Sequence, residues 1–346
     1  MDGMSDLRAL GDVALIVEGS ELGVFRWFYG AVVLIIVAVL DSRDRRVPNA
    51  VWVITMPGAA VLVGLDLQMR GADIATWGTS LAAFAWVCIH VIGRPTWQDA
   101  RSGSWPDIVL GSAIGAGALC TIWGIWTHLP SVIEAPWILI EPLDTTESMR
   151  LTRVWLMAFS MVISIPLIEM LWRLGALRGG ADAKALMMCV LILPTWSGVP
   201  IIATPPHLSA PFISLAIWSG ILMLSVPIHM VIKNISAGTR SPVGMIWHAT
   251  IIDLDDFNPE RQWLLTNIAS SHDGETGPRN RMRPVSRSRE EEWTEQAIED
   301  LNDYGESRVW VTHKHPYLVY MCLGWILLLL CGDAVGHVAG WMNQLG

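Results

Sequence analysis

The chain has 346 residues, of which 52% are hydrophobic and only 16% are charged. A water-soluble domain of this size does not hide so large an apolar fraction in one core, so the composition excludes a soluble protein and predicts an integral membrane protein. The net charge of −9 comes from acids in separate polar segments and forms no basic surface for a nucleic acid. We expect membrane lipids, and no nucleic acid, as partners.

Eight apolar segments are long enough to cross a bilayer, which takes about 20 mostly apolar residues in a helix. In the sixth, Pro194 and Pro200 predict a kink or a short second half. The expected fold is an all-α polytopic membrane protein with about eight transmembrane helices. The segments are 23–40, 50–67, 74–93, 108–127, 154–172, 185–203, 212–232 and 317–340.

Basic residues in the short loops indicate the orientation, because cytoplasmic loops are enriched in Lys and Arg. If the first segment runs from outside to inside, both termini lie outside and the inner loops are the more basic ones. The inner loops hold Arg43, Arg45, Arg46, Arg94, Arg101, Arg173, Arg178 and Lys184, whereas the outer loops hold Arg70, Arg150 and Arg153.

The composition turns polar between residues 233 and 314, which predicts a small cytoplasmic domain inserted before the last helix. This insertion is expected to be α+β or partly disordered. The expected domains are therefore a transmembrane core over 1–232, a cytoplasmic soluble domain over 233–314, and the last transmembrane helix within 315–346.

Three stretches of the polar region have interpretable patterns. Residues 277–289 contain five arginines and predict a mobile basic loop, with contact to anionic lipid as the alternative. In 290–301, Trp293, Ala297 and Leu301 recur every fourth residue and predict a short amphipathic helix. Residues 308–312 predict a short strand or an extended lead into the last helix.

Two acidic residues lie where a polar loop meets an apolar segment. Asp41 follows the first segment directly, and Asp182 precedes the sixth. Four predicted spans separate them, so both acids lie on the cytoplasmic side and at similar depth. An aspartic protease needs such a pair, with one ionised carboxylate to take a proton from water and one protonated carboxyl to polarise the scissile carbonyl. The pair predicts a membrane aspartyl protease.

Each acid also has a simpler explanation. Asp182 is suitably placed to cap the sixth helix, and the loop after Asp41 has the form of an ordinary basic inner loop in which Pro48 starts the second span. Neither explanation accounts for the shared depth and side of the two acids, which the pairing hypothesis predicts.

Both acids lie in short motifs, Asp41-Ser-Arg-Asp-Arg-Arg-Val-Pro-Asn49 and Gly179-Gly180-Ala181-Asp182-Ala183-Lys184. These resemble the signature pair of the type IV prepilin peptidase family, most closely its archaeal preflagellin and prepilin peptidases. Residues 309–316, Val-Trp-Val-Thr-His-Lys-His-Pro, are similar to a stretch of archaeal members. Ala181 replaces the second glycine of the strict Gly-x-Gly-Asp form, and the cysteine-rich loop of many bacterial relatives is missing.

The resemblance implies a membrane aspartic endopeptidase without cofactor or metal, with Asp41 and Asp182 as catalytic residues. Its substrates would be prepilins or prearchaellins that carry a short basic leader and a hydrophobic helix, cleaved at the cytoplasmic face of the cell membrane. Gly179, Gly180 and Lys184 are accessory candidates. Asp44 is the second choice for the first acid, because its spacing to Pro48 does not fit.

Other polar groups in the apolar segments have structural explanations. Glu169 and Asp333 must face protein or water rather than lipid. We expect Glu169 to pair with Arg173 one helical turn later and Asp333 to have a structural role. His313 and His315 lack a nearby third ligand and predict no metal site.

Two other functions stay open on the sequence alone. One is an intramembrane aspartyl protease of other substrates, resembling presenilin or signal peptide peptidase, although the Tyr-Asp and Pro-Ala-Leu motifs of those proteins are missing. The other is a non-enzymatic transporter or assembly factor that uses buried acids for ion coupling. The lack of paired repeats in the hydropathy argues against this second alternative.

Overall fold

The computed structural model describes residues 20–134, 146–177, 179–196, 209–239, 242–270, 276–285 and 290–345. Its contacts divide the chain into two compact units, one made of Met1–Ser219 with Leu318–Gly346 and the other of Gly220–Tyr317. The candidate acids lie in the first unit, and most of the predicted polar region lies in the second.

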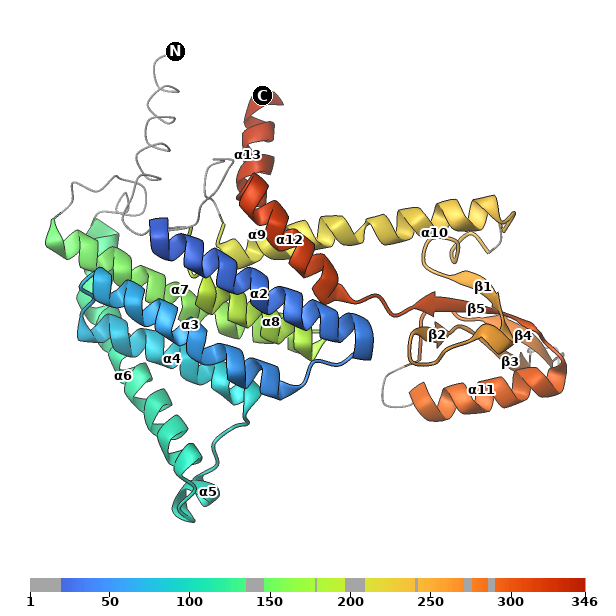
Figure 1. The fold of residues 1–346 in the computed structure, drawn as a ribbon, viewed down its shortest axis with the longest axis horizontal. Coiled ribbons are helices and arrows are strands. Elements are labelled where there is room, and N and C mark those ends of the chain that lie inside the picture. Colours follow the sequence, from blue (N-terminus) through green and yellow to red (C-terminus); the bar gives the residue numbers. More distant parts are fainter. Residues whose placement is uncertain are drawn as a thin grey trace. The chain divides into compact units, whose positions relative to one another are not determined.

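The first unit is a helical bundle (Figure 1). The described helices that lie in it, α9 only in part, are α2 (Ser20–Asp44), α3 (Asn49–Met69), α4 (Ile74–Val91), α5 (Trp97–Arg101), α6 (Trp105–Glu134), α7 (Glu147–Arg173), α8 (Gly180–Ile192), α9 (Pro211–Met223), α12 (Tyr317–Cys331) and α13 (Ala334–Leu345).

Six helical segments of the described chain are long and apolar enough to cross a membrane, and a bent pair makes up to seven. The bent pair is α12 with α13, which meet at 52°, so the expected single last helix is broken. The membrane architecture agrees with the sequence, but the predicted count of eight is not confirmed. The expected span that is not found among the described residues is the sixth, because α8 has only 13 residues. Pro200 and the rest of 197–208 lie outside the described residues.

Helix α8 is the centre of the bundle. Every residue from Ala185 to Leu193 is buried, and the helix contacts α2, α3, α4 and α7 (Figure 1). A helix that is apolar on all sides belongs in a protein interior or in lipid, and hydropathy does not distinguish the two. Here protein surrounds it, and it ends at Ile192, two residues before Pro194; the predicted short second half would lie largely outside the described residues.

A buried arginine holds the C-terminal end of α8. Arg26 of α2, only 3% exposed, donates from Nη1 to the Ile192 carbonyl at 2.9 Å, an acceptor that has no partner within its own helix. Its Nη2 lies 3.1 Å from Asp66 Oδ2, and Asp66 Oδ1 accepts from Arg70 Nε at 2.8 Å. The sequence analysis did not anticipate this network.

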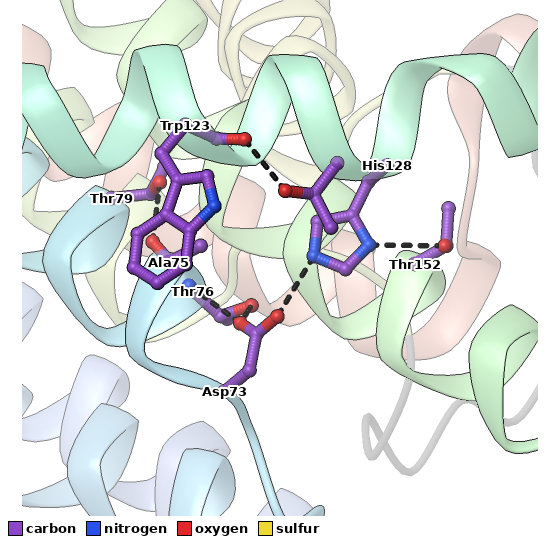
Figure 2. Close-up of polar contacts among 8 residues, drawn as sticks. Asp73, Ala75, Thr76, Thr79, Trp123, His128 and Thr152 are labelled. Carbon is purple, nitrogen blue, oxygen red and sulfur yellow. Dashed lines mark hydrogen bonds and ion pairs between the residues drawn. The ribbon is translucent and has the colours of Figure 1, made fainter.

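A second polar cluster joins α4, α6 and α7 (Figure 2). Asp73 caps α4 by accepting from the Thr76 backbone N–H at 2.8 Å. The His128 ring bridges Asp73 Oδ2 at 2.9 Å and Thr152 Oγ1 at 3.1 Å, and it stacks on Trp155. This cluster, also missed from the sequence, fixes three helices to one another.

The second unit combines helices with two small antiparallel sheets. One sheet has the strand order β1-β5-β2, and β3 pairs with β4. Its elements are the end of α9, then α10 (Ser225–Ser236), β1 (Thr250–Asp253), the short 3-10 helix Leu254–Asp256, β2 (Gln262–Leu264), β3 (Thr266–Ser270), β4 (Thr276–Asn280), α11 (Glu290–Tyr304) and β5 (Arg308–His313).

The predicted amphipathic helix and strand are both confirmed. Ala297 and Leu301 of α11 are buried in one cluster with Val309 and Val311 of β5, and Trp293 packs against this cluster. The prediction of a mobile loop was wrong for residues 277–280, which lie in β4 and pair with β3. Proline is tolerated on an edge strand, so Pro278 does not prevent the pairing.

The Arg26 network gives a stability prediction. Asp66→Leu leaves the buried Arg26 guanidinium without its carboxylate, and removal of one partner of a buried ion pair costs about 3–5 kcal/mol. We expect a clearly lower thermal midpoint in detergent micelles for Asp66→Leu. The double variant Arg26→Met/Asp66→Leu should recover only part of the loss, because it removes the unpaired charge but also the donor to the Ile192 carbonyl. Simple additivity of the two substitutions would contradict this account.

Candidate active site

Asp41 lies in the last turn of α2 and is partly buried. Its carboxylate is hydrogen-bonded by the Leu318 backbone at the start of α12. The first N–H groups of a helix have no partner within the helix, and the positive end of the helix dipole favours an anion there. The N-terminal end of α12, which is distant from Asp41 in the sequence, therefore binds the Asp41 carboxylate.

Asp182 lies at the third position of α8, where Gly179 is the N-cap. Its carboxylate accepts a hydrogen bond from the Gly179 backbone, as the acidic residue does in a capping box. The capping explanation from the sequence is thus correct in part, although the cap residue itself is Gly179.

The two glycines of the motif leave room for this arrangement. A Cβ at Gly179 would lie less than 3.0 Å from Asp182 Oδ2, a distance that real Cβ atoms essentially never show. A Cβ at Gly180 would lie 3.2 Å from the Trp172 ring. The geometry therefore requires glycine at 179 and favours it at 180.

The structure brings the Asp41 and Asp182 carboxylates close enough to interact electrostatically. Burial, followed by the negative charge of Asp41, raises the pKa of Asp182 from 3.8 to about 7, against the opposing effect of the Gly179 hydrogen bond. Loss of solvation and a nearby like charge both disfavour the ionised form. Asp182 is therefore poised to hold a proton at neutral pH.

Lys184 joins the two motifs. Its Nζ donates to Asn49 Oδ1 at 2.6 Å, so the residue two positions after Asp182 contacts the first residue of α3. Asp44, in contrast, is 56% exposed and lies 3.6 Å from Arg43 Nε. Of the two acids at the end of α2, it is Asp41 that the structure brings near Asp182.

Glu169 forms the expected pair with Arg173. It also accepts from Trp86 Nε1 at 2.9 Å and contacts His90 Nε2 at 3.1 Å, partners that the sequence did not reveal. The His90 ring lies edge-on to Trp172, whose own ring lies beside Gly180. The Glu169 cluster thus supports the wall of the candidate site.

Asp333 lies in the break between α12 and α13 and is fully buried. Its Oδ1 accepts from Ser209 Oγ at 2.6 Å and from Ser214 Oγ at 2.7 Å. These bonds agree with the expected structural role. Within the described residues, no group of three or more His, Cys, Asp or Glu side chains is placed to hold a metal ion.

Residues 243–334 match the family model described as Archaeal Peptidase A24 C-terminus Type II. The matched region is thus similar to the C-terminal part of archaeal A24 peptidases. The match supports the resemblance to archaeal prepilin and preflagellin peptidases and indicates a protease. No curated protein matches the chain.

The matched A24 region includes Leu318, whose backbone bonds Asp41. The sequence analysis missed this residue, and a side-chain motif had no means of revealing it because the contact is made by the backbone. It also missed the link from Lys184 to Asn49, although both residues lay within the quoted motifs. Only the fold shows which residues of the two motifs touch.

Substitution of Gly179 tests the geometry of the Asp182 carboxylate. In Gly179→Ala the new methyl group displaces the carboxylate, and a displacement of about 1 Å costs roughly 100-fold in rate. We expect peptidase activity to fall by at least about tenfold while the protein still folds. Gly111→Ala on α6 is the control, because its Cβ would meet nothing within 4 Å; equal activity of the two variants would contradict the prediction.

The pKa of Asp182 also predicts how stability depends on pH. Between its ordinary pKa of 3.8 and its folded value of about 7, the folded protein keeps a proton that the unfolded chain has released. The free energy of unfolding therefore falls as pH rises through this window, by up to about 1.4 kcal/mol per pH unit. Asp182→Asn removes this contribution.

We expect the thermal midpoint of Asp182→Asn, relative to that of the natural protein, to increase from pH 4 to about pH 7 and then level off. Thermal unfolding in detergent micelles across this pH range measures the difference. Parallel curves for the two proteins would show that Asp182 does not titrate in this window.

Proposed function

We propose that this protein is a membrane aspartic endopeptidase that removes short basic leaders from archaellin or type IV pilin-like precursors at the cytoplasmic face. The observation that carries the proposal is the interaction of Asp41 with Asp182, two acids that lie more than a hundred residues apart in the sequence. The match of residues 243–334 to an archaeal A24 peptidase region supports it independently, and favours it over a transporter or a presenilin-like protease.

In the proposed reaction the two carboxyl groups have different roles. Asp182, with a pKa of about 7, supplies the proton that polarises the scissile carbonyl. Asp41, which is hydrogen-bonded by the Leu318 backbone, acts in its ionised form and takes a proton from the attacking water. When the tetrahedral intermediate collapses, Asp41 passes its proton to the leaving amine and Asp182 recovers its own.

The arrangement of spans supports a site at one face of the membrane. Asp41 lies at the end of α2, and Asp182 follows α7; the described helices α3, α4, α6 and α7, all of which are candidate spans, lie between them. An even number of crossings returns the chain to the same side. The basic loop after Asp41 makes that side the cytoplasm, where the leader of a precursor would lie while its apolar helix stays in the bilayer.

The same rule places the N-terminus outside, as proposed from the sequence. The position of the C-terminus follows from whether residues 180–208 cross the bilayer. With that crossing the chain makes eight spans and both termini lie outside, as proposed; without it the C-terminus lies on the cytoplasmic side.

Three matched substitutions test the assignment. Asp41→Asn and Asp182→Asn remove the proton acceptor and the proton donor, and each is expected to lower leader removal by at least about 100-fold. Asp44→Asn, at the end of the same helix but exposed and paired with Arg43, should leave activity within about twofold. The measurement is mass spectrometry of a prepilin-like precursor reconstituted with the protein in liposomes. Full processing by both Asp41→Asn and Asp182→Asn would refute the proposed function.

A further inference from the structure

Arg45 has an unusual backbone conformation beside the candidate site. It is the first residue after α2, its N–H donates to the Asp41 carbonyl at 3.1 Å, and its φ is +54°. Within the described residues, it is the one residue other than glycine with a positive φ. This conformation is strained for an ordinary L-residue, so the turn alone favours Gly or Asn. An arginine here requires a reason in its side chain.

The Arg45 side chain carries donors without an acceptor. Nε and Nη1 are both shielded from solvent and have no hydrogen-bond partner among the described residues. A buried donor that stays unpaired destabilises the folded protein, and native structures rarely leave one unpaired. The buried Arg26, in contrast, bonds the Ile192 and Leu62 carbonyls and the Asp66 carboxylate. The unpaired donors of Arg45 point to an acceptor that arrives with a ligand.

The neighbours of Arg45 define the chemistry of that acceptor. Its charge acts on the Asp41 carboxylate, so the guanidinium lies within electrostatic reach of one of the two proposed catalytic groups. A peptide that lies across these groups presents a backbone carbonyl oxygen at every residue, and carbonyl oxygens are acceptors for arginine N–H groups. A precursor with a basic leader offers few carboxylates but always offers these carbonyls.

We infer that Arg45 is a substrate-binding residue whose Nε–H and Nη1–H donate to backbone carbonyl oxygens of the precursor next to the scissile bond. This inference rests on the proposed function. Arg45 then orients the peptide over Asp41 and Asp182, and the substrate supplies the acceptors that the free protein does not provide. The strained backbone holds the guanidinium at this position.

A comparison of Arg45 and Arg43 tests the inference. Arg43 lies two residues earlier, in the last turn of α2, but its side chain is 82% exposed and pairs with Asp44. Arg45→Gly relieves the positive φ, so the variant should be at least as stable as the natural protein. Loss of hydrogen bonds from a charged group worth about 1.5–3 kcal/mol should still lower its kcat/KM for leader cleavage by about 10–150-fold. Arg43→Gly should stay within about twofold.

A second measurement separates binding from loop architecture. Guanidinium ion added at millimolar concentration should restore part of the activity of Arg45→Gly, because it occupies the vacated position, and should not raise that of Arg43→Gly. If Arg45→Gly cleaves as well as Arg43→Gly, or if guanidinium leaves its activity loss unchanged, the inference is wrong. Loss of cleavage in Asp41→Asn, in the same assay, shows that such a failure concerns Arg45 alone and not the proposed function.

Discussion

The first unit depends on one constraint: the free backbone groups at the two ends of α8 need hydrogen-bond partners within the protein. The helix is buried from Ala185 to Leu193, and inside a membrane-embedded bundle no water is available to bond the free backbone groups at its C-terminal end. At its C-terminal end, Arg26 bonds the Ile192 carbonyl. At its N-terminal end, the Asp182 side chain bonds the Gly179 backbone. The acid proposed for catalysis thus belongs to the group of contacts that lets a short helix end inside the protein.

The charged groups of the bundle differ in whether they have hydrogen-bond partners, and the group that lacks them lies at the candidate active site. Glu169 has four nitrogen partners, Asp333 is held by serine hydroxyls, and Asp73 bonds both Thr76 and His128. Within the described part of the chain, Arg45 is the one arginine with shielded, unpartnered nitrogens. Buried groups that lack partners cost stability, and such a cost is commonly retained where a ligand is bound.

The sequence predicted what depends on local pattern or on counting. Apolar length predicted α2, α3, α4, α6 and α7, and the four-residue period of Trp293 and Leu301 predicted α11. The prediction that Asp41 and Asp182 share a side rests only on the four spans between them, so it does not depend on whether the sixth segment crosses the membrane. The count of eight was not confirmed because hydropathy is the same for a helix in lipid and for α8 within protein. The pairings of Arg26 with Asp66 and of Asp73 with His128 depend on which helices are neighbours, and no local pattern specifies that.

The contact between Leu318 and Asp41 explains how the A24 C-terminal region relates to the proposed chemistry. The region matches over 243–334, yet neither proposed catalytic residue lies in it. Its contribution to Asp41 is a backbone N–H at the start of α12, a group that every residue except proline provides. A contact of this kind constrains where α12 begins more than which side chain stands at position 318. Substitution of the Leu318 side chain would leave this contact in place, whereas a proline would remove it together with one of the groups that favour the ionised form of Asp41.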